Sequence, residues 1–143
     1  MLRIRDLLVD KGRDIWSIHP DATVYEAIDQ MAQKSVGALL VMDSGQLVGI
    51  VSERDYARKV ILKGKASQET QVREIMSYPV ICVHPELTIQ QTMTLMTEKR
   101  VRHLPVVVEE SVVGVISIGD VVRSMIEEKE YYIQQLTSYI TSG

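Results

Sequence analysis

The sequence predicts an α+β protein made of two similar β-α-β-β-α repeats and a long C-terminal helix. Three observations support this fold class: the chain repeats itself, each copy shows strand and helix signals in the same order, and an apolar helical pattern continues past the second copy. Residues 15–62 and 80–127, compared at a constant shift of 65, share 14 identities in 48 ungapped pairs. We therefore assign residues 1–65 to the first repeat and residues 66–143 to the second.

Each repeat is expected to open with a short strand followed by an amphipathic helix. The strands cover residues 15–18 and 80–83, and a His-Pro pair ends each of them. Thr23 and Thr88 are each followed three residues later by a glutamate or glutamine, which predicts a capping box and a helix start. The buried helix faces should then carry Val24, Ala27, Ile28 and Met31 in the first repeat and Ile89, Thr92, Met93 and Met96 in the second.

Two further strands and a second helix complete each repeat. An Asp-Ser-Gly turn in the first repeat and a Glu-Glu-Ser turn in the second predict hairpins. The paired strands are residues 39–42 and 47–51, and residues 104–108 and 112–116. They are nearly continuous in Val, Ile and Leu, so we expect both faces of each sheet to be covered. A lead-in also repeats at a shift of 68, residues 4–8 against 72–76, and the polar residues 63–71 form a linker.

An apolar stripe continues well past the part of the second repeat that matches the first. Its members are Val121, Val122, Met125, Ile126, Tyr132, Ile133, Leu136 and Ile140. This is more apolar surface than one small domain needs, so we interpret the C-terminal helix as a docking or dimer helix. The alternative is that it folds back on its own domain.

Composition narrows the classes of partner. Sixteen basic and nineteen acidic side chains leave a net charge of −3, which does not favour nucleic acid. No stretch approaches the ~20 apolar residues of a membrane span, and Asp10 and Lys11 come before any signal-like run could develop. The single Cys82 lies between apolar neighbours, which predicts a buried thiol and fits a reducing compartment. We expect a cytoplasmic protein that binds neither membrane nor nucleic acid.

The strongest functional signal is a Gly-x-x-Ser-x-x-Asp motif that occurs twice, from Gly49 to Asp55 and from Gly114 to Asp120. Each copy predicts a strand that runs directly into a helix. A helix N-terminus gathers unpaired N–H groups and the positive end of the helix dipole, so such a junction is suited to hold a phosphate or a ribose diol. The alternative is that Ser-x-x-Asp is only a capping box.

With these two junctions, the two His-Pro turns and the β-α-β-β-α order, the sequence resembles a tandem pair of CBS domains, an adenosine-ligand sensor module. Residues 48–59 and 116–122 are similar to those of small stand-alone CBS-pair proteins of bacteria and plants. The resemblance implies that the repeats pack with pseudo-twofold symmetry around a cleft, that pairs form flat dimers, and that adenine nucleotides bind in the cleft. We expect AMP as the ligand, with ATP, NAD or S-adenosylmethionine as alternatives.

The resemblance and the chemistry of the side chains together predict site residues. A carboxylate accepts hydrogen bonds from both ribose hydroxyls, and arginine offers a planar fork to a phosphate. The predicted ribose-binding residues are Asp55, Asp120, Ser52 and Ser117, and the predicted phosphate-binding residues are Arg54, Arg58, Arg102 and His103. The resemblance implies an adenine pocket along Ile18, His19, Gly37, Ala38, Val83, His84, Leu104, Pro105, Ile118 and Gly119.

The two junctions are not expected to be equivalent. Arg102 and His103 stand where the first repeat has glycine and alanine, so one site should be better equipped for phosphate, using Arg54 or Arg58 with this pair. Surface salt bridges are the alternative role for the arginines. Near-neutral titration of His103 would tune phosphate affinity.

The other two histidines are expected to be turn residues. His19 and His84 each precede a proline, beside the implied adenine pocket. A zinc site with Cys82 would need scattered donors, and neither CxxC nor HxxxH spacing occurs, so we predict no metal.

These observations favour a regulatory binding module over two other functions. A bound adenine nucleotide would shift the arrangement of the repeats or of a homodimer and so alter a separate partner protein. The alternatives are a structural dimerisation scaffold that binds no ligand and a nucleotide hydrolase. Hydrolysis needs a base or a metal cluster beside the phosphates, and the sequence offers no paired carboxylates and no nucleophile with an adjacent histidine. We therefore expect no catalytic residue and no catalytic cofactor.

Overall fold

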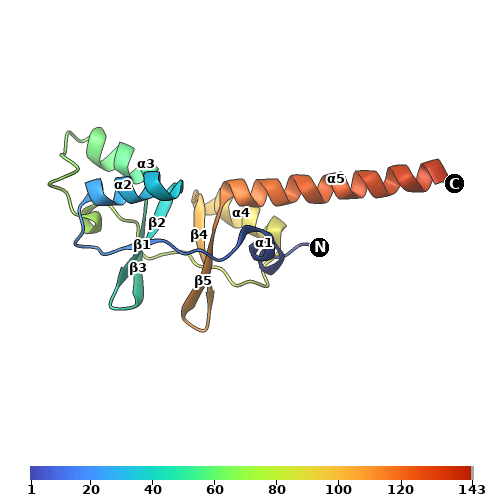
Figure 1. Cartoon of the computed structure of the whole chain (residues 1–143), viewed down its shortest axis with the longest axis horizontal. Helices are drawn as coiled ribbons and strands as arrows, with labels where there is room; N and C mark the ends of the chain where they lie inside the picture. The colour runs from blue at the N-terminus through green and yellow to red at the C-terminus, as the bar shows by residue number, and fades with distance from the viewer. Residues whose placement is uncertain (143) are drawn as a thin grey trace. The chain divides into compact units, whose positions relative to one another are not determined.

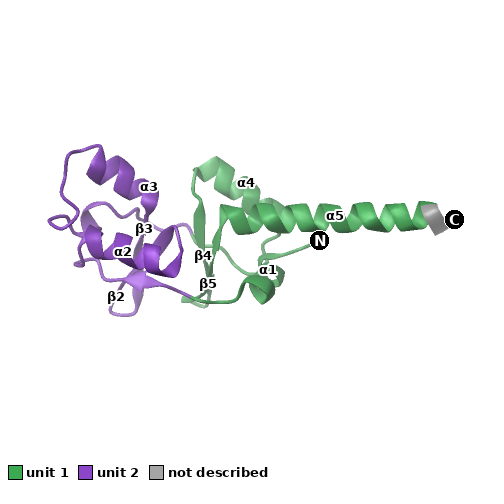
Figure 2. Cartoon of the chain, turned by 45° about the horizontal axis from the view of Figure 1, so that its top comes forward, with its two compact units in different colours: residues 1–14, 82–143 green, residues 15–81 purple. Residues whose placement is uncertain are grey.

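The computed structural model describes residues 1–142, with side chains described as far as Ile140. The chain forms two compact units, shown in different colours in Figure 2. One unit is the continuous segment Ile15–Ile81, and the other combines Met1–Asp14 with the chain from Cys82 onward. The predicted mixture of helices and small sheets with a long C-terminal helix is confirmed (Figure 1).

The unit Ile15–Ile81 follows the predicted element order of one repeat. Its elements are β1 (Ser17–Ile18), α2 (Val24–Lys34), β2 (Ala38–Asp43), β3 (Gln46–Ser52), α3 (Glu53–Tyr56), a π-helical turn at Ala57–Ile61 and a 3₁₀ turn at Val72–Glu74. The sheet order is β1-β2-β3, with β1 parallel and β3 antiparallel to β2. Thr23 caps α2, since its side chain accepts a hydrogen bond from the Glu26 N–H at 3.1 Å.

The other unit contains α1 (Ile4–Lys11), α4 (Ile89–Lys99), β4 (His103–Val108), β5 (Ser111–Ser117) and α5 (Ile118–Ser142). The predicted hairpin β4–β5 and the capping box of Thr88 with Gln91 are both present.

The predicted strand at residues 80–83 is reduced to a single bridge between Val83 and Val106. In the first repeat the Leu40 N–H donates to the Trp16 carbonyl at 3.1 Å. The residue that corresponds to Leu40 is Pro105, which has no N–H to donate. The second repeat therefore cannot form this ladder bond.

The lead-in at residues 4–8 packs on the second repeat, and the lead-in at residues 72–76 packs on the first. The Ile4 N–H donates to the Leu87 carbonyl at 2.9 Å, and the Val72 N–H donates to the Ala22 carbonyl at 2.8 Å. Because Ile4 corresponds to Val72 and Ala22 to Leu87 in the repeat alignment, these are the same contact in the two units. The two lead-ins are thus exchanged between the repeats.

Equivalent ion pairs accompany this exchange. Arg5 Nη1 lies 2.7 Å from Glu86 Oε1 in one unit, and Arg73 Nε donates to Asp21 Oδ1 at 2.9 Å in the other. The hydrogen bond from Arg73 lowers the pKa of Asp21. These pairs are exposed, so they orient the lead-ins more than they stabilise the fold.

The glycine that opens each Gly-x-x-Ser-x-x-Asp motif is explained by this packing. A Cβ atom at Gly49 would lie 2.6 Å from Met76 Sδ and 3.2 Å from the Ser77 carbonyl oxygen. A Cβ atom at Gly114 would lie 2.8 Å from Leu8 Cδ2. Met76 and Leu8 are equivalent positions of the two lead-ins, so each motif glycine makes room for a lead-in side chain.

Substitution of these glycines should therefore destabilise the two units unequally. We expect Gly49→Ala to lower the free energy of unfolding by about 1–3 kcal/mol, because the added methyl meets both a side chain and the backbone. Gly114→Ala should cost less, because only the end of the Leu8 side chain has to move. Urea unfolding of the two variants checks this order, and equal losses would contradict the packing argument.

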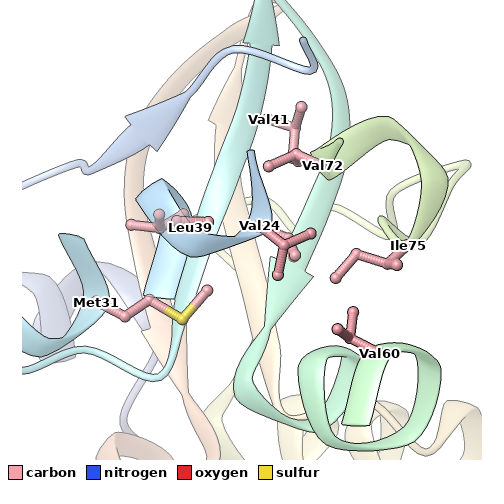
Figure 3. Packing of buried hydrophobic residues seen from close by; sticks show 9 residues of the cluster. Val24, Met31, Leu39, Val41, Val60, Val72 and Ile75 are labelled. Carbon is pink, nitrogen blue, oxygen red and sulfur yellow. The ribbon is translucent and has the colours of Figure 1, made fainter. Parts of the chain in front are cut away.

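The core of the Ile15–Ile81 unit lies between α2, the sheet and the segment from Val60 to Ile75 (Figure 3). Its buried members are Val24, Ala27, Met31, Leu39, Val41, Val51, Val60, Val72 and Ile75. Val24, Ala27 and Met31 are the predicted buried face of α2, whereas Ile28 is only partly buried. In α4 the predicted Ile89, Thr92 and Met96 are buried and Met93 is partly buried. Met31 and Met96 are core residues, as their spacing indicates.

The C-terminal helix does not fold back on its own domain. α5 is a single helix over Ile118–Ser142, and its residues from Lys129 to Ile140 are all exposed. The alternative that this segment covers its own unit is therefore wrong, while its role as a docking helix is taken up below.

The prediction of a buried thiol at Cys82 is also wrong. Cys82 is exposed, and its neighbour Val83 is buried instead, because successive side chains of an extended segment point to opposite sides. Partial burial nevertheless raises the pKa of the thiol.

Candidate functional site

Both Gly-x-x-Ser-x-x-Asp motifs form the predicted strand-to-helix junction. Asp55 Oδ2 accepts hydrogen bonds from the Ser52 N–H at 2.9 Å and from the Ser52 hydroxyl at 3.0 Å. In the second repeat, Asp120 Oδ2 accepts from the Ser117 N–H at 2.8 Å, and the Asp120 N–H donates to Ser117 Oγ at 3.2 Å. The motif is thus a capping box in both repeats. A carboxylate has about four acceptor positions, so capping leaves room for further hydrogen bonds.

A lysine side chain lies against each of these carboxylates. Lys59 Nζ is 3.1 Å from Asp55 Oδ1 and donates to the Ile75 carbonyl at 2.9 Å. Lys11 Nζ forms a close ion pair with Asp120 Oδ2 and donates to the Val115 carbonyl at 2.6 Å. Both aspartate side chains are largely buried, at 13% and 11% exposure. Each junction is therefore a partly buried ion pair at a helix start.

The two lysines come from different places in the chain. Lys59 follows Asp55 by one helical turn, whereas Lys11 belongs to α1, the exchanged lead-in. The repeat alignment puts Ser124 opposite Lys59, and the lead-in alignment puts Pro79 opposite Lys11. Sequence reasoning missed both lysines as site residues. For Lys59, the four-residue spacing after Asp55 was an available signal.

Two opposing effects act on the Asp120 carboxyl group. Burial by itself would raise its pKa, but hydrogen bonds from Lys11 and Ser117 and the charge of Lys11 outweigh burial and lower the pKa from its ordinary value. Arg123 Nη1 lies 3.6 Å from Asp120 Oδ1 and adds a second, exposed cation. Asp120 is therefore held as a carboxylate, the form that accepts hydrogen bonds from a ribose.

His103 lies beside this group. It is paired with Ser117 across β4 and β5, and burial, followed by the nearby charge of Lys11, lowers its pKa from the ordinary 6.5. The charge of Asp120 opposes this shift and that of Arg102 adds to it. His103 is thus a largely neutral imidazole near three charged side chains, able to gain a proton when an anion approaches.

The two junctions differ in the residues that lie at the start of the neighbouring strand. The Glu53 N–H donates to the Gly37 carbonyl at 3.0 Å, and the Ile118 N–H donates to the Arg102 carbonyl at 2.8 Å. Gly37 and Arg102 therefore hold the same place, as do Ala38 and His103, which pair with the motif serines. One junction carries Arg102 and His103, and the other carries two small residues.

The remaining predicted site residues are distributed over several elements. Arg54 lies in α3, and Arg58 is exposed in the following turn. Six of the ten residues implied for an adenine pocket lie in β1 (Ile18), at the start of β2 (Ala38), in β4 (Leu104 and Pro105) and in the first turn of α5 (Ile118 and Gly119). The other four, His19, Gly37, Val83 and His84, lie outside the helices and strands.

The histidines before Pro20 and Pro85 are turn residues. His19 Nδ1 accepts from the Asp21 N–H at 3.0 Å, and His84 Nδ1 accepts from the Glu86 N–H at 3.1 Å. Among the residues that the structure describes, no three His, Cys, Asp or Glu side chains gather as a metal site would require.

Comparison with known proteins gives the family. The model of the CBS domain matches residues 4–62 and 72–127. This chain belongs to the CBS-domain family. The two matched segments are the two repeats found in the sequence.

Relatives of this CBS pair include both plant and bacterial proteins. The mitochondrial CBS domain-containing protein CBSX3 of Arabidopsis thaliana is 41% identical over 98% of this chain and 72% of its own length. The solved structure of a protein with CBS domains from Burkholderia ambifaria is 46% identical and superposes with a TM-score of 0.85, covering 87% of this chain and 94% of the other.

A more distant CBS domain pair shares the fold. It was solved in complex with 5-methylthioadenosine and S-adenosyl-L-methionine, and it has a TM-score of 0.79 at 24% identity, over 90% of this chain and 98% of its own. Within the described part of the chain, no helix has the length and apolar character needed to cross a membrane.

Proposed function

We propose that this CBS pair is a regulatory module that binds an adenosine ligand at its Ser-x-x-Asp junctions, with AMP as the first candidate. The observation that carries the proposal is the paired arrangement itself: two helix starts, each with a largely buried carboxylate in a fixed orientation. Ribose offers two adjacent hydroxyls, which a carboxylate binds in charge-assisted hydrogen bonds. The distant CBS pair solved with two adenosine compounds supports this choice of chemical class, and the regulated protein is proposed to be a separate chain.

The junction of the second repeat is the better candidate for a phosphorylated ligand. Lys11, His103, Arg102 and Arg123 contribute cations or donors around Asp120. The first junction has Lys59 at the equivalent carboxylate but glycine and alanine in place of the Arg-His pair. We therefore propose that the second junction prefers nucleotides over nucleosides more strongly than the first does.

Titration calorimetry with AMP, ATP, NAD and S-adenosylmethionine tests the proposal directly. We expect saturable heat from at least AMP, and a matching mass among small molecules released from the purified protein. Heat from none of the four would favour the dimerisation scaffold. Turnover of ATP or NAD during the titration would favour a hydrolase.

Removing Lys11 should distinguish the binding of the phosphate from the binding of the ribose. The Lys11 ammonium occupies the Asp120 oxygen that a ribose hydroxyl would use, and once displaced it can pair with a phosphate. We expect Lys11→Met to weaken AMP binding about tenfold, a loss of about 1.4 kcal/mol, while adenosine binds as well as before or better. Lys99→Met, an exposed lysine at the end of α4, is the control. Equal losses for AMP and adenosine would contradict the phosphate role.

A further inference from the structure

The C-terminal half of α5 is a helix without cover from its own unit. Every residue from Lys129 to Ile140 is exposed, and in Figures 1 and 2 this part of the helix runs on beyond α1, α4 and the β4–β5 hairpin. An isolated helical segment of this length is marginal in water, because tertiary packing supplies most helix stability. A stable α5 therefore requires a second surface.

The exposed apolar side chains of this helix follow a seven-residue repeat. Ile126, Ile133 and Ile140 are spaced by seven and are 51%, 54% and 76% exposed. If they are the a positions of a heptad, the d positions are Val122, Lys129 and Leu136. We call these six residues the isoleucine seam. Apolar residues that recur strictly every seven positions, or 3.5 on average, are typical of helices that wind around each other. On a straight helix packed against a globular core, the apolar residues recur every 3.6 positions on average.

We infer that the isoleucine seam pairs with the same seam of a second copy of this chain, as a parallel two-stranded coiled coil. β-Branched residues at a together with leucine at d favour two parallel strands. When two identical seams pair in parallel, each isoleucine meets the same isoleucine of the other copy. This buries the three regularly spaced, exposed isoleucines of α5 at once. This inference does not depend on the ligand or on the proposed regulatory function.

The charges of the helix fit a second copy. Lys129 at d would insert beside the e position of the facing helix, which is Glu130, so the one charged residue of the seam meets an opposite charge. Glu127 and Glu128 lie away from the seam, at b and c. They give the polar face a negative character that an anionic membrane surface would repel, so a membrane is the poorer occupant.

Sedimentation equilibrium of the full chain tests the inference with a matched pair of variants. Tyr131 is at f, opposite the seam, and is 57% exposed, close to the exposure of Ile133. We expect Ile133→Asp to raise the dimer dissociation constant at least tenfold and to reduce the helical circular dichroism signal. Tyr131→Asp should change neither quantity. Indistinguishable dissociation constants for the two variants would overturn the proposal.

Cross-linking determines the direction of the two helices. In a Cys82→Ser background, Ile126→Cys and Ile140→Cys are each oxidised alone and then as a mixture. Residues at a of a parallel pair face their own counterparts within disulfide reach, so each variant should form a disulfide dimer by itself. Disulfides that form only in the mixture would show antiparallel helices and refute the parallel arrangement.

Discussion

Replacing Asp120 by asparagine is expected to weaken AMP binding by roughly 10- to 150-fold, because a charged hydrogen bond contributes about 1.5–3 kcal/mol. The substitution keeps the shape of the side chain and one oxygen to accept from the Ser117 N–H, so the helix start should persist. What is lost is the negative charge that binds the ribose hydroxyls and orients Lys11. Asp55→Asn should have a similar effect on any site at the first junction. Calorimetric titration with AMP measures both losses.

Thr23→Ala separates ligand binding from helix capping. Thr23 caps α2 by accepting a hydrogen bond from the Glu26 N–H at 3.1 Å, and it belongs to neither motif. Its substitution should lower the free energy of unfolding to a similar extent as the junction variants but leave AMP affinity intact. Unchanged AMP affinity in both Asp55→Asn and Asp120→Asn would show that the two motif carboxylates are caps only.

The second large effect is expected from the pH dependence of nucleotide binding. Burial and the charge of Lys11 lower the pKa of His103 in the free protein. A phosphate nearby would favour the imidazolium form and raise this pKa, so binding of AMP takes up a proton. By linkage, AMP affinity should rise as the pH falls from 7.5 towards 6. Titrations in buffers of different ionisation enthalpy measure the proton uptake directly.

His103→Gln should remove this proton uptake and flatten the affinity profile. Adenosine is the ligand control, since it has no phosphate and should show no uptake with the unmodified protein. AMP itself titrates near pH 6, so the decisive quantity is the difference between the unmodified protein and the His103→Gln variant. An unchanged uptake in the variant would mean that His103 does not face the phosphate.

The lowered pKa of His103 also affects the stability of the ligand-free protein, and there a fall in pH has the opposite effect. Between the pKa of His103 in the folded protein and the ordinary 6.5, the unfolded chain binds more protons than the folded one. The free energy of unfolding therefore falls as the pH drops through 6.5 and levels off below the folded pKa. In the ligand-free protein, acid weakens the fold, whereas in the presence of AMP the same acid strengthens binding.

Much of the fold was predictable because its signals are local. The helix starts at Thr23 and Thr88 and the junctions at Ser52 and Ser117 depend on residues three positions apart. The strands of each hairpin pair across a short turn. Because the chain is duplicated, the sequence indicates each element twice. The single bridge that replaces the predicted strand at residues 80–83 has its cause in Pro105 on the partner strand, so the signals within residues 80–83 alone did not reveal it.

What could not be predicted depends on contacts between distant parts of the chain. Lys11 meets Asp120 across 109 residues, and no spacing rule relates them. The exchange of the lead-ins is likewise hidden, because residues 4–8 and 72–76 match each other equally well wherever they pack. The exposure of Cys82 was mispredicted from its apolar neighbours, since an extended segment turns alternate side chains outward.

The exchange of the lead-ins also affects how the protein is made. Residues 1–14 leave the ribosome before their partners, which begin at Cys82, so they must wait while the Ile15–Ile81 unit is completed. Their contacts have a large sequence separation, which makes this docking a late step of folding. A fragment that ends at residue 65 would lose the segment that its own repeat packs on. A single cut between the two repeats therefore removes from each unit a segment that it packs on.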